Sequence, residues 1–224
     1  MKSKYPILIP IKGNSVRCPN KNRILLAYTI TYLQEIKRLE DAIVITDSLD
    51  LESYAKLLGV RTYFEVRIDN QDELLSCYNF LKKAEMREDY FFLMPVTHPF
   101  RTLSLCNLFE EKKEKYPNID FIVSLNVFTD RSNFFVDIGD DNNPRFLYKK
   151  SRRGQDCKQY YMVDGALYLI KKSFLERVIQ ESNTNYHFWK GKFQSVINEA
   201  PFIDIDTIHD MERFNFIRKN IGNM

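Results

Sequence analysis

Two groups of residues, near opposite ends of the chain, are of the types that bind phosphate and metal ions. The first is segment 10–22, which reads PIKGNSVRCPNKN and offers the cations Lys12, Arg17 and Lys21 together with Gly13. Polyphosphate oxygens need charge-assisted donors, and a glycine lets the backbone approach them closely. The segment matches neither a Walker A loop nor a dinucleotide fingerprint. Taken alone, the segment is more typical of a solvated basic loop than of a phosphate-binding site.

The second group is segment 203–210, which reads IDIDTIHD. In a strand, the period of two sends the two isoleucines to the core and both Asp204 and Asp206 to the open face. Neighbouring carboxylates repel each other unless a cation lies between them. Hard oxygen ligands favour Mg²⁺, which keeps some of its waters and shares substrate phosphates. The alternative is a polar strand end, where Thr207 and Asp210 form the capping box of a final helix.

The elements that must position these groups alternate along the chain, as apolar runs too short for helices are separated by longer amphipathic stretches. This alternation predicts an α/β fold, in which helices cover both sides of a mostly parallel sheet. Ligands of such sheets bind beyond the carboxyl ends of the strands. The predicted strands are Ile7 to Ile11, Ala42 to Thr46, Tyr90 to Met94, Phe121 to Leu125 and Tyr160 to Ile170, and the predicted helices are 25–38, 48–58, 71–87, 102–115 and 207–219.

The pattern changes between residues 126 and 160. Two short candidate strands, Phe134 to Ile138 and Arg145 to Lys149, flank the turn-forming sequence GDDNNP. This arrangement predicts a β-hairpin inserted into a single domain that spans residues 1–224.

Composition narrows the class of protein. The 224 residues are 44% hydrophobic and 28% charged, which is typical of a globular domain, and the net charge of +3 does not indicate a nucleic-acid surface. The sequence has no 18-residue apolar run, so we expect no membrane span. The four cysteines lack the spacing of a zinc or redox motif, which favours reduced thiols and a cytoplasmic protein. These cysteines are Cys18, Cys77, Cys106 and Cys157.

Besides segment 10–22, four short segments stand out in order along the chain, namely VITD at 44–47, THPFRT at 97–102, DGALY at 164–168 and DIDT at 204–207. With these segments the chain resembles the acylneuraminate (CMP-sialic acid) cytidylyltransferases, as a divergent member, because the family has similar motifs in the same order. The matches in the first loop are Gly13, Ser15, Arg17, Pro19, Lys21 and Asn22, with Lys12 in place of an arginine.

The resemblance implies a three-layer, Rossmann-like nucleotidyltransferase fold with the inserted hairpin. It also implies a reaction in which CTP and an acidic sugar give a CMP-sugar and pyrophosphate with the help of Mg²⁺. The implied nucleotide-binding residues are Lys12, Gly13, Ser15, Arg17, Lys21, Asn22 and Ser76, of which Asn22 and Ser76 would meet the cytosine. Asp204 and Asp206 would bind the metal and, with Arg17 and Lys21, form the catalytic set. Asp164 and Tyr168 would face the sugar.

Several departures from the family pattern fall in the sugar half of the site. Met162 stands where an arginine is common, Pro95 replaces a glutamine and Asp164 replaces an asparagine, while Val16 replaces a lysine of the first loop. Two alternatives therefore stay open. One is a transferase for another sugar acid or nucleotide, such as a Kdo-like or pseudaminic-type acid. The other is a catalytically weak or non-catalytic nucleotide-binding relative.

The family resemblance also implies a homodimer, because the corresponding insertion reaches across to a second subunit. The sequence gives an independent indication, since a short hairpin cannot bury five large aromatic residues alone. Arg153 is then expected near the partner's sugar pocket. The five aromatic residues are Phe128, Phe134, Phe135, Phe146 and Tyr148.

Overall fold

The fold is built on a seven-stranded sheet. A computed structural model describes residues 5–13, 15, 17–69, 71–84, 86–128, 136–138, 144–146, 160–181 and 183–221. The strand order is β3-β2-β1-β4-β8-β5-β9, and β8 is antiparallel to both neighbours whereas the other pairs are parallel. The strands are β1 (Ile7–Ile11), β2 (Ala42–Thr46), β3 (Arg61–Phe64), β4 (Tyr90–Leu93), β5 (Phe121–Phe128), β8 (Tyr160–Lys171) and β9 (Phe193–Ile197).

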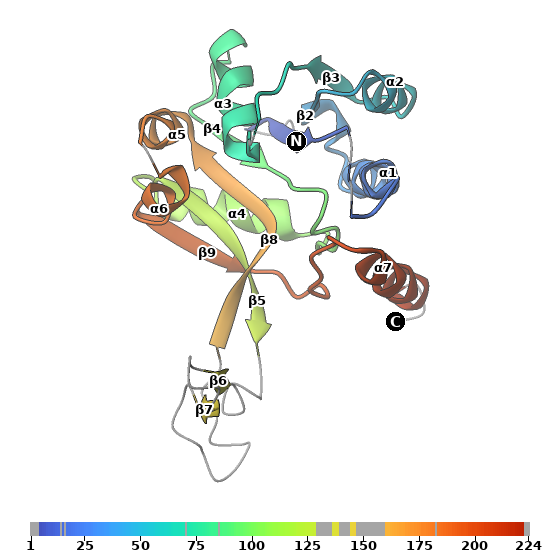
Figure 1. The fold of residues 1–224 in the computed structure, drawn as a ribbon. Coiled ribbons are helices and arrows are strands. Elements are labelled where there is room, and N and C mark those ends of the chain that lie inside the picture. The colour runs from blue at the N-terminus through green and yellow to red at the C-terminus, as the bar shows by residue number, and fades with distance from the viewer. Residues whose placement is uncertain are drawn as a thin grey trace.

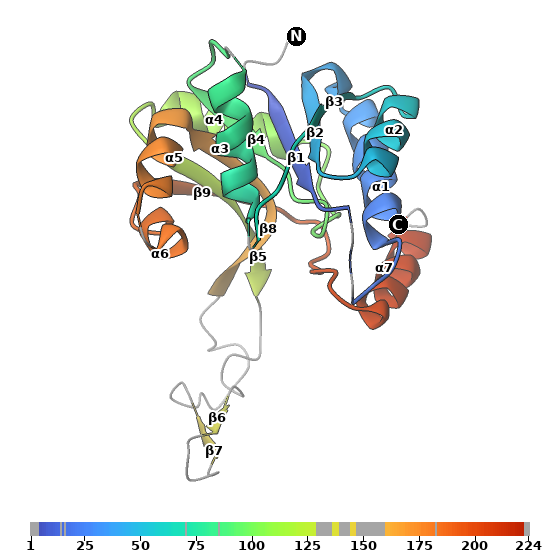
Figure 2. The same cartoon turned by 45° about the horizontal axis from the view of Figure 1, so that its top comes forward.

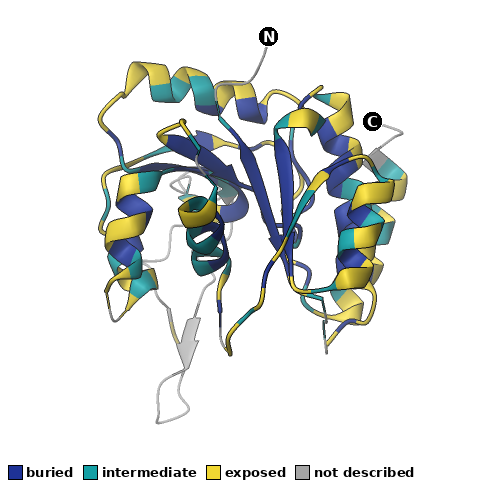
Figure 3. Cartoon of the chain, turned by 90° about the horizontal axis from the view of Figure 1, so that it is seen from above, coloured by how far each residue is buried: buried dark blue, intermediate teal, exposed yellow. Residues whose placement is uncertain are grey.

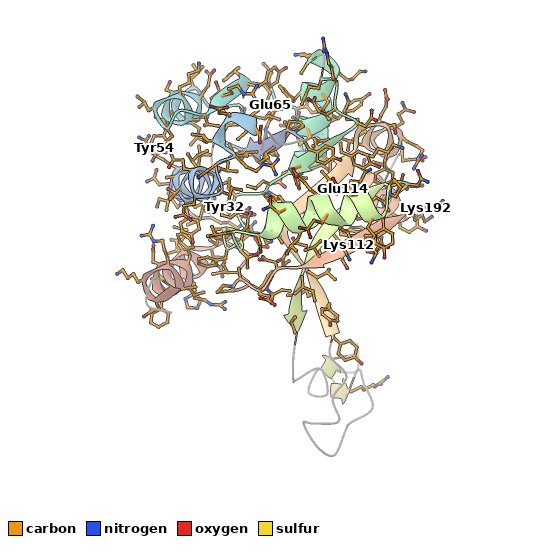
Figure 4. The ribbon with its side chains drawn as sticks, turned by 180° about the vertical axis from the view of Figure 1, so that it is seen from behind. Tyr32, Tyr54, Glu65, Lys112, Glu114 and Lys192 are labelled. Atoms are coloured by element: carbon orange, nitrogen blue, oxygen red, sulfur yellow. The ribbon has the colours of Figure 1, made fainter. Side chains whose placement is uncertain are left out.

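Helices form a layer on each face of the sheet (Figures 1 and 2). One apolar cluster joins the sheet to α1 (Lys21–Glu35), α2 (Leu49–Leu57), α4 (Leu105–Lys115) and α7 (Ile208–Ile221). The other joins it to α3 (Glu73–Lys83), α5 (Lys172–Ile179) and α6 (Thr184–Phe188). Figure 3 shows the strands buried between helices whose outer faces are exposed, and Figure 4 shows α4 with Lys112 on the face seen from behind. The predicted α/β fold is confirmed.

Some boundaries differ from the prediction in ways that matter for the site. Helix α1 begins at Lys21, four residues before the predicted start, so Lys21 and Asn22 lie in its first turn. The edge strands β3 and β9 and the short helices α5 and α6 were not predicted. A 3₁₀ turn at Leu39–Asp41 (η1) leads into β2.

The insertion follows β5. Strands β5 and β8 pair as far as Phe128 and Tyr160, so residues 126–128 belong to the sheet. Beyond them β6 (Val136–Ile138) and β7 (Pro144–Phe146) pair antiparallel (Figure 1). Strand β6 lies within the predicted strand Phe134 to Ile138, whereas β7 begins one residue before the predicted strand Arg145 to Lys149. The rest of those predicted strands, and the side chains of the five aromatic residues of the predicted dimer contact, lie outside what the structure describes.

The parallel strands bring the loop after β1 to the edge of the sheet where the carboxyl ends of β1, β2, β3 and β4 meet. Cys18, Cys77 and Cys106 are buried and free of disulfides, and Cys157 lies outside the described residues. None of the helices within the described ranges is long and apolar enough to cross a membrane.

Candidate functional site

The loop after β1 is held in place by its neighbours. The Gly13 amide donates to Oδ1 of Asp47 at 2.7 Å, and the Asn22 side chain donates to the Lys12 carbonyl at 2.6 Å. A Cβ on Gly13 would lie 2.8 Å from the Cβ of Ser48, so this close approach requires glycine. Asn22 was predicted to meet the cytosine, and in this structure its amide ties the loop to α1.

Two cations from the N-terminal segment meet the C-terminal acidic segment. The ammonium Nζ of Lys21 donates to the Ile205 carbonyl at 2.7 Å and lies 3.3 Å from Oδ1 of Asp206. The guanidinium of Arg17 lies 3.2 Å from the same oxygen. The Lys21 side chain is 9% exposed and that of Arg17 is 69% exposed, so Lys21 is the firmly positioned cation of the two.

The acidic segment alternates as predicted, but it is not a strand. Ile203 and Ile205 are buried, whereas the side chains of Asp204 and Asp206 are 49% and 42% exposed. The backbone makes a single bond toward the sheet edge, from the Ile205 amide to the Thr97 carbonyl at 3.0 Å, so no ladder forms. The period of two therefore comes from an extended segment anchored by its isoleucines, which corrects the predicted strand.

The predicted capping box is present at the start of α7. The Thr207 amide donates to Oδ2 of Asp210 at 2.9 Å, and the Asp210 amide donates to Oγ1 of Thr207 at 3.3 Å. The Thr207 hydroxyl also donates to Oδ2 of Asp210 at 2.7 Å, and this bond, followed by that from the Thr207 amide, lowers the pKa of the Asp210 carboxyl. Asp210 is thus committed to the helix end, whereas Asp204 and Asp206 keep half-exposed carboxylates, that of Asp206 paired through one oxygen with Lys21 and Arg17.

Asp204 and Asp206 offer the oxygen donors that Mg²⁺ prefers. Within the described ranges, no three His, Cys, Asp or Glu side chains gather closely enough to hold a metal by themselves. A metal at this pair would therefore take its remaining ligands from substrate phosphates and water, which is the usual arrangement for Mg²⁺. The donor set fits that ion.

A cleft of about 450 Å³ opens beside Asp206. Four cations and three carboxylates line it, which suits a polyanion that also carries a metal. The lining includes three of the implied phosphate-binding cations, together with Ser15 and Asn22. The charged lining residues are Lys12, Arg17, Lys21, Arg67, Asp72, Glu73 and Asp206.

A buried polar network holds Arg67 at the wall of this cleft. The Nε of Arg67 donates to Oε1 of Glu65 at 2.7 Å. The side-chain Nε2 of Gln71 donates to Oε2 of Glu65 at 2.8 Å and to Oγ of Ser76 at 2.9 Å. Glu65, labelled in Figure 4, follows β3 directly. The Arg67 side chain is 7% exposed, and its Nη2 is buried with no hydrogen-bond partner among the described residues.

An orphaned guanidinium donor is costly to bury, so Arg67 Nη2 marks a position where a ligand acceptor is expected. The same network includes Ser76, which was predicted to line the base pocket. Ser76 is fully buried behind Gln71 and supports the network rather than lining the cleft.

A second cavity of about 260 Å³ adjoins the cleft, and the two share Asp72, Glu73 and Thr97. Tyr168, predicted to face the sugar, lines this cavity, and burial raises the pKa of its hydroxyl. Among the described residues that line it, none is a lysine or an arginine. The remaining lining residues are Leu74, Leu93, Pro95, His98, Gly165, Asn185, Phe188 and Trp189.

His98 stands between the cavity and the acidic segment. Its Nε2 lies 3.6 Å from Oδ1 of Asp204, and its Nδ1 lies 3.1 Å from Oγ1 of Thr97. Burial lowers the pKa of His98, and the Asp204 charge opposes that shift. The backbone of Gly165, at φ +69°, packs so closely that a Cβ there would lie 2.8 Å from the imidazole ring.

Asp164, the other predicted sugar-facing residue, is buried in the sheet. Its carboxylate accepts from Oγ of Ser124, from Nδ2 of Asn198 at 2.8 Å and from the Ala166 amide at 3.0 Å. These bonds satisfy the buried charge and join β5, β8 and the segment after β9. A contact between Asp164 and a sugar stays a prediction. Arg153 lies outside the described residues.

Comparison with solved structures identifies the fold of the chain, whereas comparison of sequences finds no match. No family model and no curated protein matches the sequence. Among solved structures, CMP:2-keto-3-deoxy-manno-octonic acid synthetase complexed with CTP is similar, with a TM-score of 0.73 at 15% identity, over 97% of this chain and 99% of that one.

Two further solved structures are similar over nearly the whole chain. The 4-diphosphocytidyl-2C-methyl-D-erythritol synthase of Anaerococcus prevotii has a TM-score of 0.63 at 14% identity, over 97% of this chain and 100% of that one. A cytidylyltransferase from Leptospira borgpetersenii has a TM-score of 0.63 at 17% identity, over 98% and 95%. The chain has the Rossmann-like α/β fold of the nucleotidyltransferases.

Proposed function

We propose that this chain is a cytidylyltransferase that joins CTP and an acidic sugar to give a CMP-sugar and pyrophosphate. The observation that carries the proposal is the convergence of the N-terminal cations and Asp206 on one cleft, next to a cavity of sugar size whose His98 contacts Asp204. The motif resemblance and the structural likeness to cytidylyltransferases, one of them complexed with CTP, support the same reaction.

In this proposal the cleft binds the triphosphate. Lys12, Arg17 and Lys21 supply charge-assisted bonds to phosphate oxygens, and Arg17 and Lys21 exchange part of their contact with Asp206 for the ligand. Arg67 Nη2 donates to an acceptor on the base or ribose, because this donor has no protein partner within the described chain. Most of the catalysis then comes from positioning and charge neutralisation.

Asp204 and Asp206 would hold Mg²⁺. When bound, that ion neutralises phosphate charge and stabilises the departing pyrophosphate. The orientation of the two carboxylates is fixed because the buried isoleucines on either side of Asp204 hold the backbone, and the capping box holds the start of α7.

The acceptor cavity needs a cation if the sugar is an acid. The described walls provide none, and the basic sequence 149–153 (KKSRR), which contains Arg153, is the proposed source, from this subunit or from a partner. An exposed apolar row at the base of the insertion supports a homodimer. Leu125 pairs with Val163 on one side and Ile197 on the other, and both partners are exposed.

A second candidate acceptor is one without a carboxylate. The observation that favours it is the acidic and aromatic character of the described cavity, where Asp72 and Glu73 face Tyr168 and Trp189. A neutral polyol would avoid the repulsion that an acid meets beside these carboxylates.

Pyrophosphate release tests the proposal. The full-length protein is incubated with Mg²⁺ and each of the four ribonucleoside triphosphates, against nine-carbon sugar acids, eight-carbon sugar acids and neutral polyols. We expect release that depends on CTP and on a sugar acid. Release that depends on a polyol alone would establish the second candidate, and CTP binding without release from any acceptor would indicate a non-catalytic relative.

A further inference from the structure

The residues shared by the cleft and the cavity stand where the two substrates would meet. Asp72, Glu73 and Thr97 are the only residues that line both spaces within the described chain. A hydroxyl in the cavity must approach the α-phosphorus of a triphosphate in the cleft along this boundary. A group that takes the hydroxyl proton must therefore lie here, within hydrogen-bond reach of that hydroxyl.

Two of the three shared residues are already engaged. Asp72 caps α3, because its Oδ1 accepts from the Leu75 amide at 2.8 Å. The Thr97 hydroxyl lies 3.1 Å from His98 Nδ1. Glu73, in the first turn of α3, has no hydrogen bond or ion pair to any described residue. Its carboxylate is thus the free acceptor at the boundary.

The surroundings of Glu73 keep it protonatable near neutral pH. Burial raises the pKa of the Glu73 carboxyl to about 7, with smaller upward contributions from Asp72 and Asp204 and downward ones from Arg67 and Lys12. Two further groups near it are Tyr168 on β8 and Cys77 one turn along α3; both are already neutral near pH 7 at their ordinary pKa, and burial raises the pKa of each further. A base works best when its pKa lies near the working pH.

We propose that Glu73 is the catalytic base of the transfer, which makes this inference dependent on the proposed function. Its carboxylate takes the proton of the acceptor hydroxyl while that oxygen forms a bond to the α-phosphorus of CTP. The bond from the α-phosphorus to the oxygen bridging the α- and β-phosphates breaks, and pyrophosphate leaves with the electron pair. Glu73 then carries the proton and returns it to water after the products depart.

His98 is the rival base within the described residues. It lines the cavity but not the cleft, and its two ring nitrogens face Thr97 and Asp204. Its place behind the acidic segment suits a residue that positions Asp204. Substitution of Glu73 and of His98 should therefore have different effects on the pH profile.

The test compares Glu73→Gln with His98→Gln and with the exposed helix control Glu176→Gln. Turnover is measured from pH 5.5 to 9 with CTP and the sugar acid that supports release, and CTP affinity is measured by calorimetry. In the wild type, kcat should rise with pH through an apparent pKa near 7, because the base must be deprotonated. Glu73→Gln should lower kcat roughly 100- to 10,000-fold, abolish that limb and leave the CTP Kd within about threefold. His98→Gln should keep the limb.

Three results would overturn the assignment. If the Glu73→Gln variant keeps a near-normal kcat, the reaction needs no base at this position. If the same variant no longer binds CTP, Glu73 has a structural role. If the His98→Gln variant, and not Glu73→Gln, loses the rise of kcat with pH, His98 is the base. If the wild type releases no pyrophosphate with any acceptor, the proposed function fails and the role of Glu73 fails with it.

Discussion

The cleft and the cavity differ in charge and in how completely the described chain builds them. The cleft has four cations, two of them nearly buried and fixed by neighbours, as Lys21 is bonded to the Ile205 carbonyl and Arg67 to Glu65. The cavity is walled by aromatic rings and two carboxylates, and among its described lining residues there is no cation. In the proposed function, the nucleotide is therefore bound by residues of the sheet edge, whereas an acidic acceptor requires a cation from elsewhere.

The largest effect should come from the acidic pair Asp204 and Asp206, of which Asp206 lines the cleft. Asp204→Ala and Asp206→Ala should each reduce pyrophosphate release on the order of 1,000-fold at saturating Mg²⁺, because they remove ligands of the ion that stabilises phosphate charge. Thermal unfolding should change little, since both side chains are exposed and the buried isoleucines remain. Near-normal turnover in either variant would refute the metal assignment.

The next effect separates the phosphate contacts within the cleft. Lys21→Ala should weaken CTP binding roughly 10- to 100-fold, and Arg17→Ala should weaken it less, because Arg17 is mostly exposed and screened by solvent. Both variants should lose less affinity for CMP than for CTP. Calorimetry with the two nucleotides checks this, and equal losses would move these side chains away from the β- and γ-phosphates.

A smaller effect should distinguish the two arginines on either side of Glu65. Arg67→Gln should weaken CTP binding about tenfold, because the orphaned Nη2 donor is proposed to meet the nucleotide. The matched control is Arg61→Gln on β3, whose guanidinium bonds the Glu40 carbonyl at an exposed position, and it should bind CTP normally. If both variants bind alike, the orphaned donor has no part in recognition.

The smallest expected change concerns the missing cation of the cavity. Mixed dimers of an Asp204→Ala subunit with an Arg153→Ala subunit should recover about half of wild-type activity if Arg153 acts across the interface, since one site of the two is then intact. Light scattering must first show a dimer at micromolar concentration. A monomer, or mixed dimers without recovery, would remove the partner from the acceptor site.

The sequence predicted the fully buried strands better than the partly exposed ones. The bounds of β1 and β2 were predicted correctly because strands buried on both faces read as unbroken apolar runs. The edge strands β3 and β9 were missed, since an edge strand such as Arg61–Phe64 carries exposed and half-buried residues that give no apolar run. For the same reason the short alternation at 203–206 predicted which side chains face out but not the absence of a ladder.

The site was predictable where chemistry is concentrated in a short segment. Lys12, Arg17, Lys21 and Asp206 were identified from two motifs, and the structure brings them to one cleft. The Glu65–Gln71–Ser76 network depends on a loop that folds back after β3, which periodicity does not encode. Glu73 gave no signal either, because a glutamate after the N-cap Asp72 is an ordinary helix start.

The most direct test of the central claim is a phosphorus NMR record of one reaction mixture that contains the protein, Mg²⁺, CTP and a sugar acid. The proposed function predicts that the CTP signals fall while pyrophosphate and a single phosphodiester signal, that of the CMP-sugar, grow in equal amounts. Pyrophosphate that appears together with free CMP, with no phosphodiester formed from any acceptor, would contradict it.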